Sequence, residues 1–183
     1  MQLTLQHIQQ LKQKHAPTQK MVFEGLFSTM FRVCQRYVVR VDEAEDCVMK
    51  GFMKAFQQLD QFTYTHELSF MHWLKRIMVN EALMALRKQT NLSLVAIEDH
   101  QTDVALDDAL LQQLDAKYLF EVITKLPIGY RTVLNMFIVE GYSHQEIADA
   151  LGITESTSKT QLAKAKAKLK QVIIQKQYGY GNA

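Results

Sequence analysis

The chain has 183 residues, enough for one ordinary domain or two small ones, and its 48% hydrophobic and 22% charged content excludes an intrinsically disordered protein. With only two prolines and seven glycines it does not suit a turn-rich β-sandwich or barrel, so we expect an all-α fold. No apolar run reaches the ~18 residues of a membrane span, and residues 1–20 lack the apolar core of a secretory signal, so we predict a cytoplasmic protein without membrane insertion.

The net charge of +2 is unevenly distributed along the chain. Residues 1–88 carry 12 Lys and Arg against 8 Asp and Glu, and residues 117–183 carry nine against five. Between these two basic segments, residues 89–116 carry six carboxylates and no Lys or Arg. Two basic bodies joined by an acidic segment indicate two contacts with a polyanion and a different role for the segment between them.

Two amphipathic helices are predicted near the N-terminus. Residues 21–38 and then 44–59 place apolar side chains at steps of three and four, which defines one buried face on each helix. Asp42 is the expected N-cap of the second helix. Cys34 and Cys47 fall on these apolar faces and match no metal-ligand spacing, so we expect buried thiols and no metal site.

A polar loop and a third helix complete the first predicted module. The loop spans residues 60–69 and contains two aromatic side chains. Ser69 then begins a helix that continues to about Lys88 and ends on two basic residues, as suits the negative end of a helix dipole. We therefore predict a compact helical bundle over residues 1–89.

The second predicted module follows an acidic linker over residues 90–115 and spans residues 116–183. Pro127 is expected early in a helix, where its missing N–H is tolerated. Helices are expected over residues 116–126, 128–140, 143–150 and 155–175. The complete prediction is two small helical bundles joined by an acidic linker.

The most specific pattern lies near the C-terminus and predicts a helix-turn-helix. Ser143 and Glu146 form an S-x-x-E capping box, which begins a helix. Ala148 is small where a second helix must cross closely, and Gly152 suits a left-handed residue after the helix. Thr154 can cap the next helix. The inner faces of the two helices are formed by Ile147, Ala148, Leu151, Leu162, Ala165 and Leu169.

The second helix of this motif is the most basic part of the chain. Residues 156–176 contain six lysines and no acidic residue. On charge alone, a solvated amphipathic helix is the simpler interpretation. Because a capped helix with small residues at the crossing precedes it, we interpret it as a recognition helix that enters the major groove of DNA. Ser156 and Thr157 lie in its first turn, where hydroxyl and N–H groups suit phosphate.

This C-terminal unit, preceded by the sequences LPIGYR and EGYS, resembles the fourth region of extracytoplasmic-function (ECF) sigma factors, subunits of bacterial RNA polymerase. Residues 42–56 (DEAEDCVMKGFMKAF) and 70–87 (FMHWLKRIMVNEALMALR) resemble the polymerase-docking helix and the minus-ten helix of the second region. The resemblance extends over residues 20–172, with the motifs in the family's order. It implies an alternative sigma factor that binds core RNA polymerase and promoter DNA and promotes strand opening.

The resemblance implies that the outer face of the helix over 42–56 docks on core polymerase. Met49 and Met53 are apolar although they lie opposite the core stripe, which independently suggests a partner surface. The alternative is that they merely project into solvent. The implied polymerase-binding residues are Glu45, Asp46, Met49, Lys50 and Met53.

For the minus-ten element, the resemblance implies capture of the melted strand by the polar loop and the third helix. Flipped bases require aromatic or apolar contacts, with basic groups along the backbone. Trp73 also lies on the apolar face, so core packing is its alternative role. The implied residues are Phe62, Tyr64, His66, Trp73, Lys75, Arg76, Asn80, Arg87 and Lys88.

For the minus-thirty-five element, the resemblance implies base contacts from the recognition helix and a phosphate contact from Lys166. The base-facing residues that it implies are Lys159, Thr160, Ala163 and Lys164. The complete predicted minus-thirty-five set is Ser156, Thr157, Lys159, Thr160, Gln161, Ala163, Lys164 and Lys166. Four positions depart from the family pattern and bear on promoter sequence and affinity. They are Ser158 for valine, Gln161 for arginine, Met84 for aspartate and Lys50 for an acidic residue.

Two other functions compete with this interpretation of the sequence. A helix-turn-helix regulator with an N-terminal sensor or dimerisation domain accounts for the C-terminal motif but not for the basic third helix or the aromatic loop. An enzyme finds no support, because the sequence has no phosphate-binding glycine loop, metal-ligand cluster or nucleophile elbow. We therefore expect no cofactor, no metal and no small-molecule substrate. An anti-sigma factor is a further partner to consider.

Overall fold

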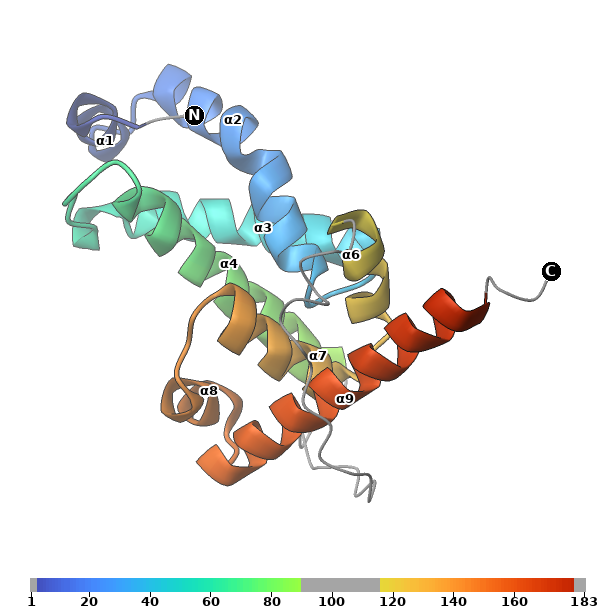
Figure 1. Cartoon of the computed structure of the whole chain (residues 1–183). Helices are drawn as coiled ribbons and strands as arrows, with labels where there is room; N and C mark the ends of the chain where they lie inside the picture. The colour runs from blue at the N-terminus through green and yellow to red at the C-terminus, as the bar shows by residue number, and fades with distance from the viewer. Residues whose placement is uncertain (1–2, 90–115, 180–183) are drawn as a thin grey trace. The chain divides into compact units, whose positions relative to one another are not determined.

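A computed structural model describes residues 3–89 and 116–179, and every regular element in these ranges is helical, which confirms the all-α prediction (Figure 1). The chain divides into two compact units, Met1–Asn91 and Leu92–Ala183. The predicted acidic linker lies outside the described residues. Within the described residues, no helix combines the length and the apolar character needed to cross a bilayer.

The first unit is built around three long helices. Its elements are α1 (Leu5–Lys12), α2 (Ala16–Gln35), α3 (Val41–Gln57), the short 3-10 helix η1 (Leu59–Gln61) and α4 (Ser69–Gln89). Helix α3 packs against both α2 and α4, and α2 also contacts α4. The apolar faces predicted from helical spacing meet in one core, with Met30, Val48 and Phe70 fully enclosed. Cys34 and Cys47 are free and buried, as predicted.

Helix α1 was not expected from the sequence. It begins with a capping box in which a histidine takes the place of the usual Glu, since the N–H of Thr4 donates to Nδ1 of His7 over 3.1 Å. Ile8 and Leu11 bury one side of this short helix, which packs against α2. Helix α2 itself begins at Ala16 rather than near residue 21, with a proline in its first turn.

The beginning of α3 corrects a second expectation. Arg40 occupies the N-cap position and makes no side-chain capping bond, so Asp42 is not the N-cap. Asp42 lies in the first turn, where its carboxylate contacts the Arg40 guanidinium at 2.6 Å. The Arg40 hydrogen bond is the main cause that lowers the pKa of Asp42. The carboxylate still suits the positive end of the helix dipole, although it reaches this position without capping the backbone.

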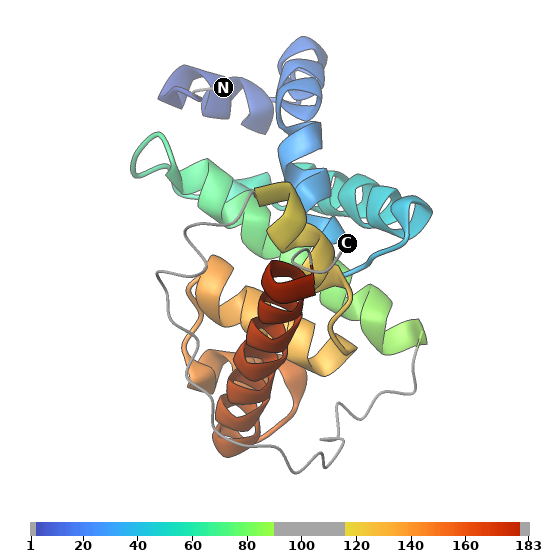
Figure 2. The ribbon, with the colours of Figure 1, turned by 45° about the vertical axis from the view of Figure 1, so that its right-hand side comes forward.

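The second unit contains the helix-turn-helix. Its elements are α6 (Ala116–Thr124), α7 (Ile128–Leu134), the π-helical turn η2 (Asn135–Val139), α8 (His144–Leu151) and α9 (Glu155–Gly179). Both α7 and α8 pack against α9, as Figure 2 shows. The helix expected over 128–140 is thus divided between α7 and η2, and Pro127 is the residue before α7 rather than within it. Leu162, Ala165 and Leu169 form the buried stripe of α9, as predicted.

Candidate nucleic-acid interface

Local hydrogen bonds place α8 and α9 as the sequence motif predicts. The Ser143 Oγ accepts the N–H of Glu146 at 3.2 Å, and the Ser143 N–H donates to the Glu146 carboxylate at 2.9 Å. Gly152 ends α8 with φ of 69°, a left-handed conformation in which a side chain would be strained. The Gly152 N–H donates to the carbonyl of Ala148, which closes the last turn before the chain reverses toward α9.

The first turn of α9 is capped from its own chain. The N–H of Thr157 donates to Oγ1 of Thr154 at 3.0 Å, and the two threonine hydroxyls lie 2.8 Å apart. Thr154 therefore acts as the predicted cap. The polar groups of Thr157 are already engaged in this cap, whereas Ser156 is exposed in the same turn. Of the two residues, Ser156 is thus the better placed to meet a phosphate.

Helix α9 separates the predicted minus-thirty-five residues into two faces. Lys159, Thr160 and Ala163 are exposed, and Lys164 and Lys166 are half-buried. Gln161 is only 2% exposed, and its side-chain amide lies beside α7. A Cβ added to Gly129 of α7 would lie 2.9 Å from the Gln161 Oε1, which shows how closely the two helices approach. The structure therefore places Gln161 in the helix interface and not on a DNA-reading surface.

The burial of Gln161 could have been predicted from spacing. Gln161 lies four positions before Ala165, and Ser158 lies four positions before Leu162, so both fall on the buried side of the helix. The polar character of Gln161 suggested a DNA contact, but helical periodicity assigns it to the core face. Ser158 is likewise fully buried, and its hydroxyl lies 2.9 Å from Nδ1 of His144.

Electrostatic interactions shape the exposed end of α9. The Lys159 ammonium contacts the Glu155 carboxylate one turn earlier at 2.6 Å. This hydrogen bond is the main cause that lowers the pKa of Glu155. Because both side chains are substantially exposed, the pair contributes little to stability and can open to water or to DNA. The Lys159 side chain thus stays near the start of α9 but can adopt other conformations.

The loop after η1 is ordered by one serine and one aromatic cluster. The Ser69 hydroxyl accepts the N–H of Thr65 at 3.3 Å and donates to the carbonyl of His66 at 2.6 Å. Phe62 is only 5% exposed, and its ring centroid lies 5.6 Å from Phe70 and 5.1 Å from Trp73.

These contacts assign the loop aromatics to different roles. Because both neighbours cover its ring, Phe62 belongs to the core and is not available for stacking on a base. Trp73 is half-buried, which agrees with its alternative role in packing. Tyr64 is half-buried and His66 is exposed, so these two remain accessible from the loop.

The remaining minus-ten candidates lie along α4. Arg76, Asn80 and Arg87 are exposed at intervals of four and seven residues, so they share one side of the helix. Lys75 is half-buried beside this row. Lys88 is exposed but lines a pocket between α4 and α3, on another side of the helix. The structure thus places Lys88 on a different side of α4 from Arg76, Asn80 and Arg87.

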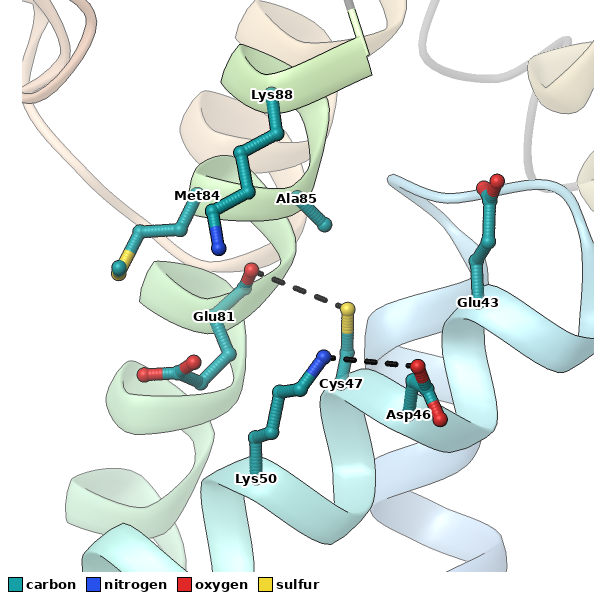
Figure 3. Close-up of a pocket in the computed structure, with 8 residues that line it drawn as sticks. All are labelled: Glu43, Asp46, Cys47, Lys50, Glu81, Met84, Ala85 and Lys88. Carbon is teal, nitrogen blue, oxygen red and sulfur yellow. Dashed lines mark hydrogen bonds and ion pairs between the residues drawn. The ribbon is translucent and has the colours of Figure 1, made fainter.

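This pocket has a volume of about 200 Å³ and joins the predicted polymerase-binding helix to α4 (Figure 3). Its lining is mixed in charge, with carboxylates from both helices and two lysines. The residues that line it are Glu43, Asp46, Cys47, Lys50, Glu81, Met84, Ala85 and Lys88. Among the predicted docking residues, the structure brings Asp46 and Lys50 together at 3.5 Å.

Several pocket residues were not predicted to belong to this surface. Glu81 contacts the Lys54 ammonium at 3.0 Å, and its backbone carbonyl accepts a weak hydrogen bond from the Cys47 thiol at 3.9 Å. Met84, which departs from the family pattern, lines the pocket and is exposed. The spacing of Glu81, Met84 and Lys88 along α4 was the available signal, because these positions share one helix face.

The predicted apolar contacts of α3 lie on its exposed surface. Met49 is 48% exposed and Met53 is 59% exposed, one turn apart, and Glu45 is exposed on the same helix. Burial is the main cause that raises the pKa of the Cys47 thiol, to about 11, so this pocket-lining thiol is protonated at neutral pH. Among the described residues, no three His, Cys, Asp or Glu side chains form a group that could hold a metal ion.

Comparison with known proteins agrees with this arrangement. The sequence profile for Sigma-70 region 2 matches residues 23–91, and the profile for Sigma-70, region 4 matches residues 109–169. The ECF RNA polymerase sigma factor SigW of Bacillus subtilis is 27% identical over 154 residues, which cover 78% of this chain and 81% of that protein. SigM of Mycobacterium tuberculosis is 26% identical over 163 residues, covering 87% of this chain and 81% of that protein.

A solved structure shares the fold. A chain of the structure described as CnrH in complex with the cytosolic domain of CnrY superposes with a TM-score of 0.50 at 19% identity, covering 91% of this chain and 94% of that one. The chain belongs to the ECF sigma factors of the sigma-70 family. It is an alternative sigma factor, a regulatory subunit that acts in promoter recognition and transcription initiation. The match of residues 23–91 to region 2 decides against an N-terminal sensor domain.

Proposed function

We propose that this sigma factor divides promoter reading between its modules, residues 1–89 and 116–183. The outer face of α9 reads the minus-thirty-five element, with base contacts from Lys159, Thr160 and Ala163. The observation that supports this assignment is the partition of α9, which exposes these side chains and buries Gln161. Ser156, Lys164 and Lys166 border the reading face and are assigned to phosphate or to the edge of the groove.

The experiment that tests this reading face uses a matched pair of lysines. Lys159→Ala is expected to weaken discrimination between an intact and an altered minus-thirty-five element by ~1–3 kcal/mol, the usual contribution of a base contact. Lys168 is also exposed but lies more than two turns further along α9, so Lys168→Ala serves as the control. Holoenzyme initiation on both promoter versions provides the measurement. Equal, sequence-independent losses from the two variants would contradict the assignment.

We assign capture of the minus-ten strand to the accessible part of the first unit. Tyr64 and His66 in the loop are the candidates for stacking, and Arg76, Asn80 and Arg87 lie in a row along α4. Aromatic faces accept unpaired bases of any sequence, and cationic side chains follow the backbone. Phe62 is excluded from this set because Phe70 and Trp73 cover its ring. Trp73 and Lys75 are half-buried and are assigned to packing beside this surface.

Docking on core polymerase is assigned to the outer face of α3 and the adjoining pocket. Exposed methionines adapt to an irregular partner surface, and the surrounding Glu45, Asp46 and Lys50 supply charges that set orientation. Met53→Ser is expected to weaken holoenzyme assembly about tenfold, because an interface anchor contributes more than ~1 kcal/mol. Met21→Ser, at an exposed methionine of α2, is the control. Fluorescence titration of core polymerase distinguishes them, and equal affinities would remove α3 from the interface.

An anti-sigma factor is proposed as a second occupant of the same methionines. Because any protein that covers Met49 and Met53 would prevent docking, such a partner would compete with core polymerase for the free sigma factor. The Met53→Ser variant should then lose affinity for both partners. A partner that binds this variant as tightly as the wild type occupies another surface.

A further inference from the structure

His144 occupies a position where three elements of the second unit meet. It is the first residue of α8, directly after the Ser143 cap. Its ring stacks on Phe137 of η2, with centroids 4.4 Å apart and an angle of 22° between the planes. Its Nδ1 lies 2.9 Å from Oγ of Ser158 on α9. One side chain therefore links η2, α8 and the recognition helix.

Both ends of this link are constrained. Ser158 is 0% exposed, so its hydroxyl has no access to bulk water and depends on a protein partner. The capping box holds the backbone of His144 at the helix start, since Ser143 and Glu146 bond reciprocally. Breaking the link would leave a buried hydroxyl unmatched, which is unfavourable compared with either an intact pair or two apolar groups.

The imidazole is best suited to this link when it is neutral. Burial is the first cause that lowers the pKa of His144, and the Lys159 ammonium of α9 acts in the same direction, whereas Glu155 of the same helix opposes them. A neutral imidazole has one donor and one acceptor nitrogen, and a serine hydroxyl can match either of them. The positive end of α8 also disfavours an imidazolium at its first residue.

The orientation of α9 is sensitive to the position of Ser158. This residue directly precedes Lys159 in the first two turns of the helix, and each residue advances around a helix by about 100°. A small rotation of α9 at Ser158 would therefore redirect Lys159 and Thr160 away from one set of base edges and toward another. A constraint on the buried side of this turn therefore determines the direction in which the exposed side chains of Lys159 and Thr160 point.

We propose that His144 is a positioning residue for promoter reading, because it joins Phe137 to Ser158 and so sets the orientation in which α9 presents Lys159 to the minus-thirty-five element. This role rests on the proposed function of the exposed face of α9. His144 need not touch DNA to exert it. The link acts through the hydroxyl of Ser158 and the stacked ring of Phe137.

The test is a double-mutant cycle on holoenzyme with His144→Phe, Ser158→Ala and the double variant. Phenylalanine retains an aromatic ring for stacking on Phe137 but has no group for the hydroxyl. The readout is the ratio of initiation from a promoter selected with the wild-type holoenzyme to initiation from the same promoter with its minus-thirty-five element altered. Each single variant should lower this ratio about three- to tenfold, and the double variant should lose much less than the product of the two losses.

A parallel thermal unfolding measurement by circular dichroism separates positioning from general stability. Ratios that fall in each single variant and fall little further in the double variant, at similar unfolding temperatures, support the proposal. Independent losses that multiply in the double variant overturn it, as does an unchanged ratio in variants that only unfold more easily. His144→Asn, which retains a hydrogen-bonding amide near the Nδ1 position, should keep most of the wild-type ratio.

Lys159→Ala distinguishes failure of this proposal from failure of the reading face. If Lys159→Ala lowers the ratio while the His144 and Ser158 variants leave it unchanged, α9 reads the element without the link and the positioning role is wrong. If Lys159→Ala leaves the ratio unchanged, the reading face itself is wrong and the positioning role fails with it.

Discussion

Gly51 allows α3 and α4 to approach closely behind the proposed docking face. A Cβ at this position would overlap Sδ of Met78 and lie 2.8 Å from its Cε. Met78 is itself fully buried, so its side chain has little room to move aside. The glycine is therefore required by the contact with α4, although a glycine within a helix is unfavourable by about 1 kcal/mol relative to alanine.

The effect of Gly51→Ala follows from two opposing contributions. Alanine would gain about 1 kcal/mol of helix propensity, whereas inserting a methyl group into a packed core costs about 1–3 kcal/mol. Because methionine is the most adaptable of the large apolar side chains, we place the cost near the middle of that range. The free energy of unfolding of the first unit should then fall by about 1 kcal/mol, the difference between about 2 and about 1.

Urea unfolding followed by tryptophan fluorescence measures this change in the first unit, because Trp73 is the single tryptophan of the chain. Gly25→Ala is the matched control, since Gly25 lies exposed within α2 and should gain about 1 kcal/mol from propensity alone. If Gly51→Ala stabilises the unit as much as Gly25→Ala does, the close contact between α3 and α4 is refuted.

Two further predictions concern the loop and the recognition helix. Tyr64→Ala should reduce permanganate reactivity of the melted minus-ten strand, because a stacked base contributes ~1–3 kcal/mol only after opening, while Phe62→Ala should instead destabilise the first unit by about 3 kcal/mol as a core truncation. Equal unfolding midpoints for these two variants would contradict this division. His144 should make the second unit sensitive to acid. The pKa of His144 in the folded protein lies below the ~6.5 of an unfolded histidine. The stability that neutral His144 contributes is therefore complete above that value and is lost as the pH falls through the folded pKa. Between pH of about 7.5 and about 5.5, the unfolding temperature of the wild type should therefore fall more than that of His144→Phe, because phenylalanine has no proton to bind. Parallel declines would assign the acid sensitivity to other groups.

The helix-turn-helix could be predicted closely from the sequence because its determinants are local. The capping box of Ser143 and Glu146, the left-handed Gly152 and the Thr154 cap each act within a few residues of chain. Such bonds depend little on the rest of the fold. The positions where α8 and α9 begin therefore agree with the prediction.

The burial of polar and aromatic residues was harder to predict because it depends on distant neighbours. The polar loop around Phe62 suggests a DNA contact, but Phe70 and Trp73 of α4 cover its ring. Helix α1 was missed for a similar reason. Its buried apolar positions, Ile8 and Leu11, are too few to define a periodic face, and packing on α2 supplies the stability that local helix propensity does not.

A chain with two different binding surfaces has a property that a two-fold symmetric regulator lacks. The fully exposed part of the reading face of α9 is small, and one good base contact contributes only ~1–3 kcal/mol of discrimination. Many helix-turn-helix proteins double such a surface by forming a two-fold dimer, which reads a palindrome and so has no preferred direction along DNA. Here the proposed second surface is a different one, in the first unit, and covalent connection would raise its effective concentration once the first is bound. Because the two surfaces differ, they fit a promoter in only one orientation. We therefore infer that the same asymmetry that adds affinity also sets the direction of transcription.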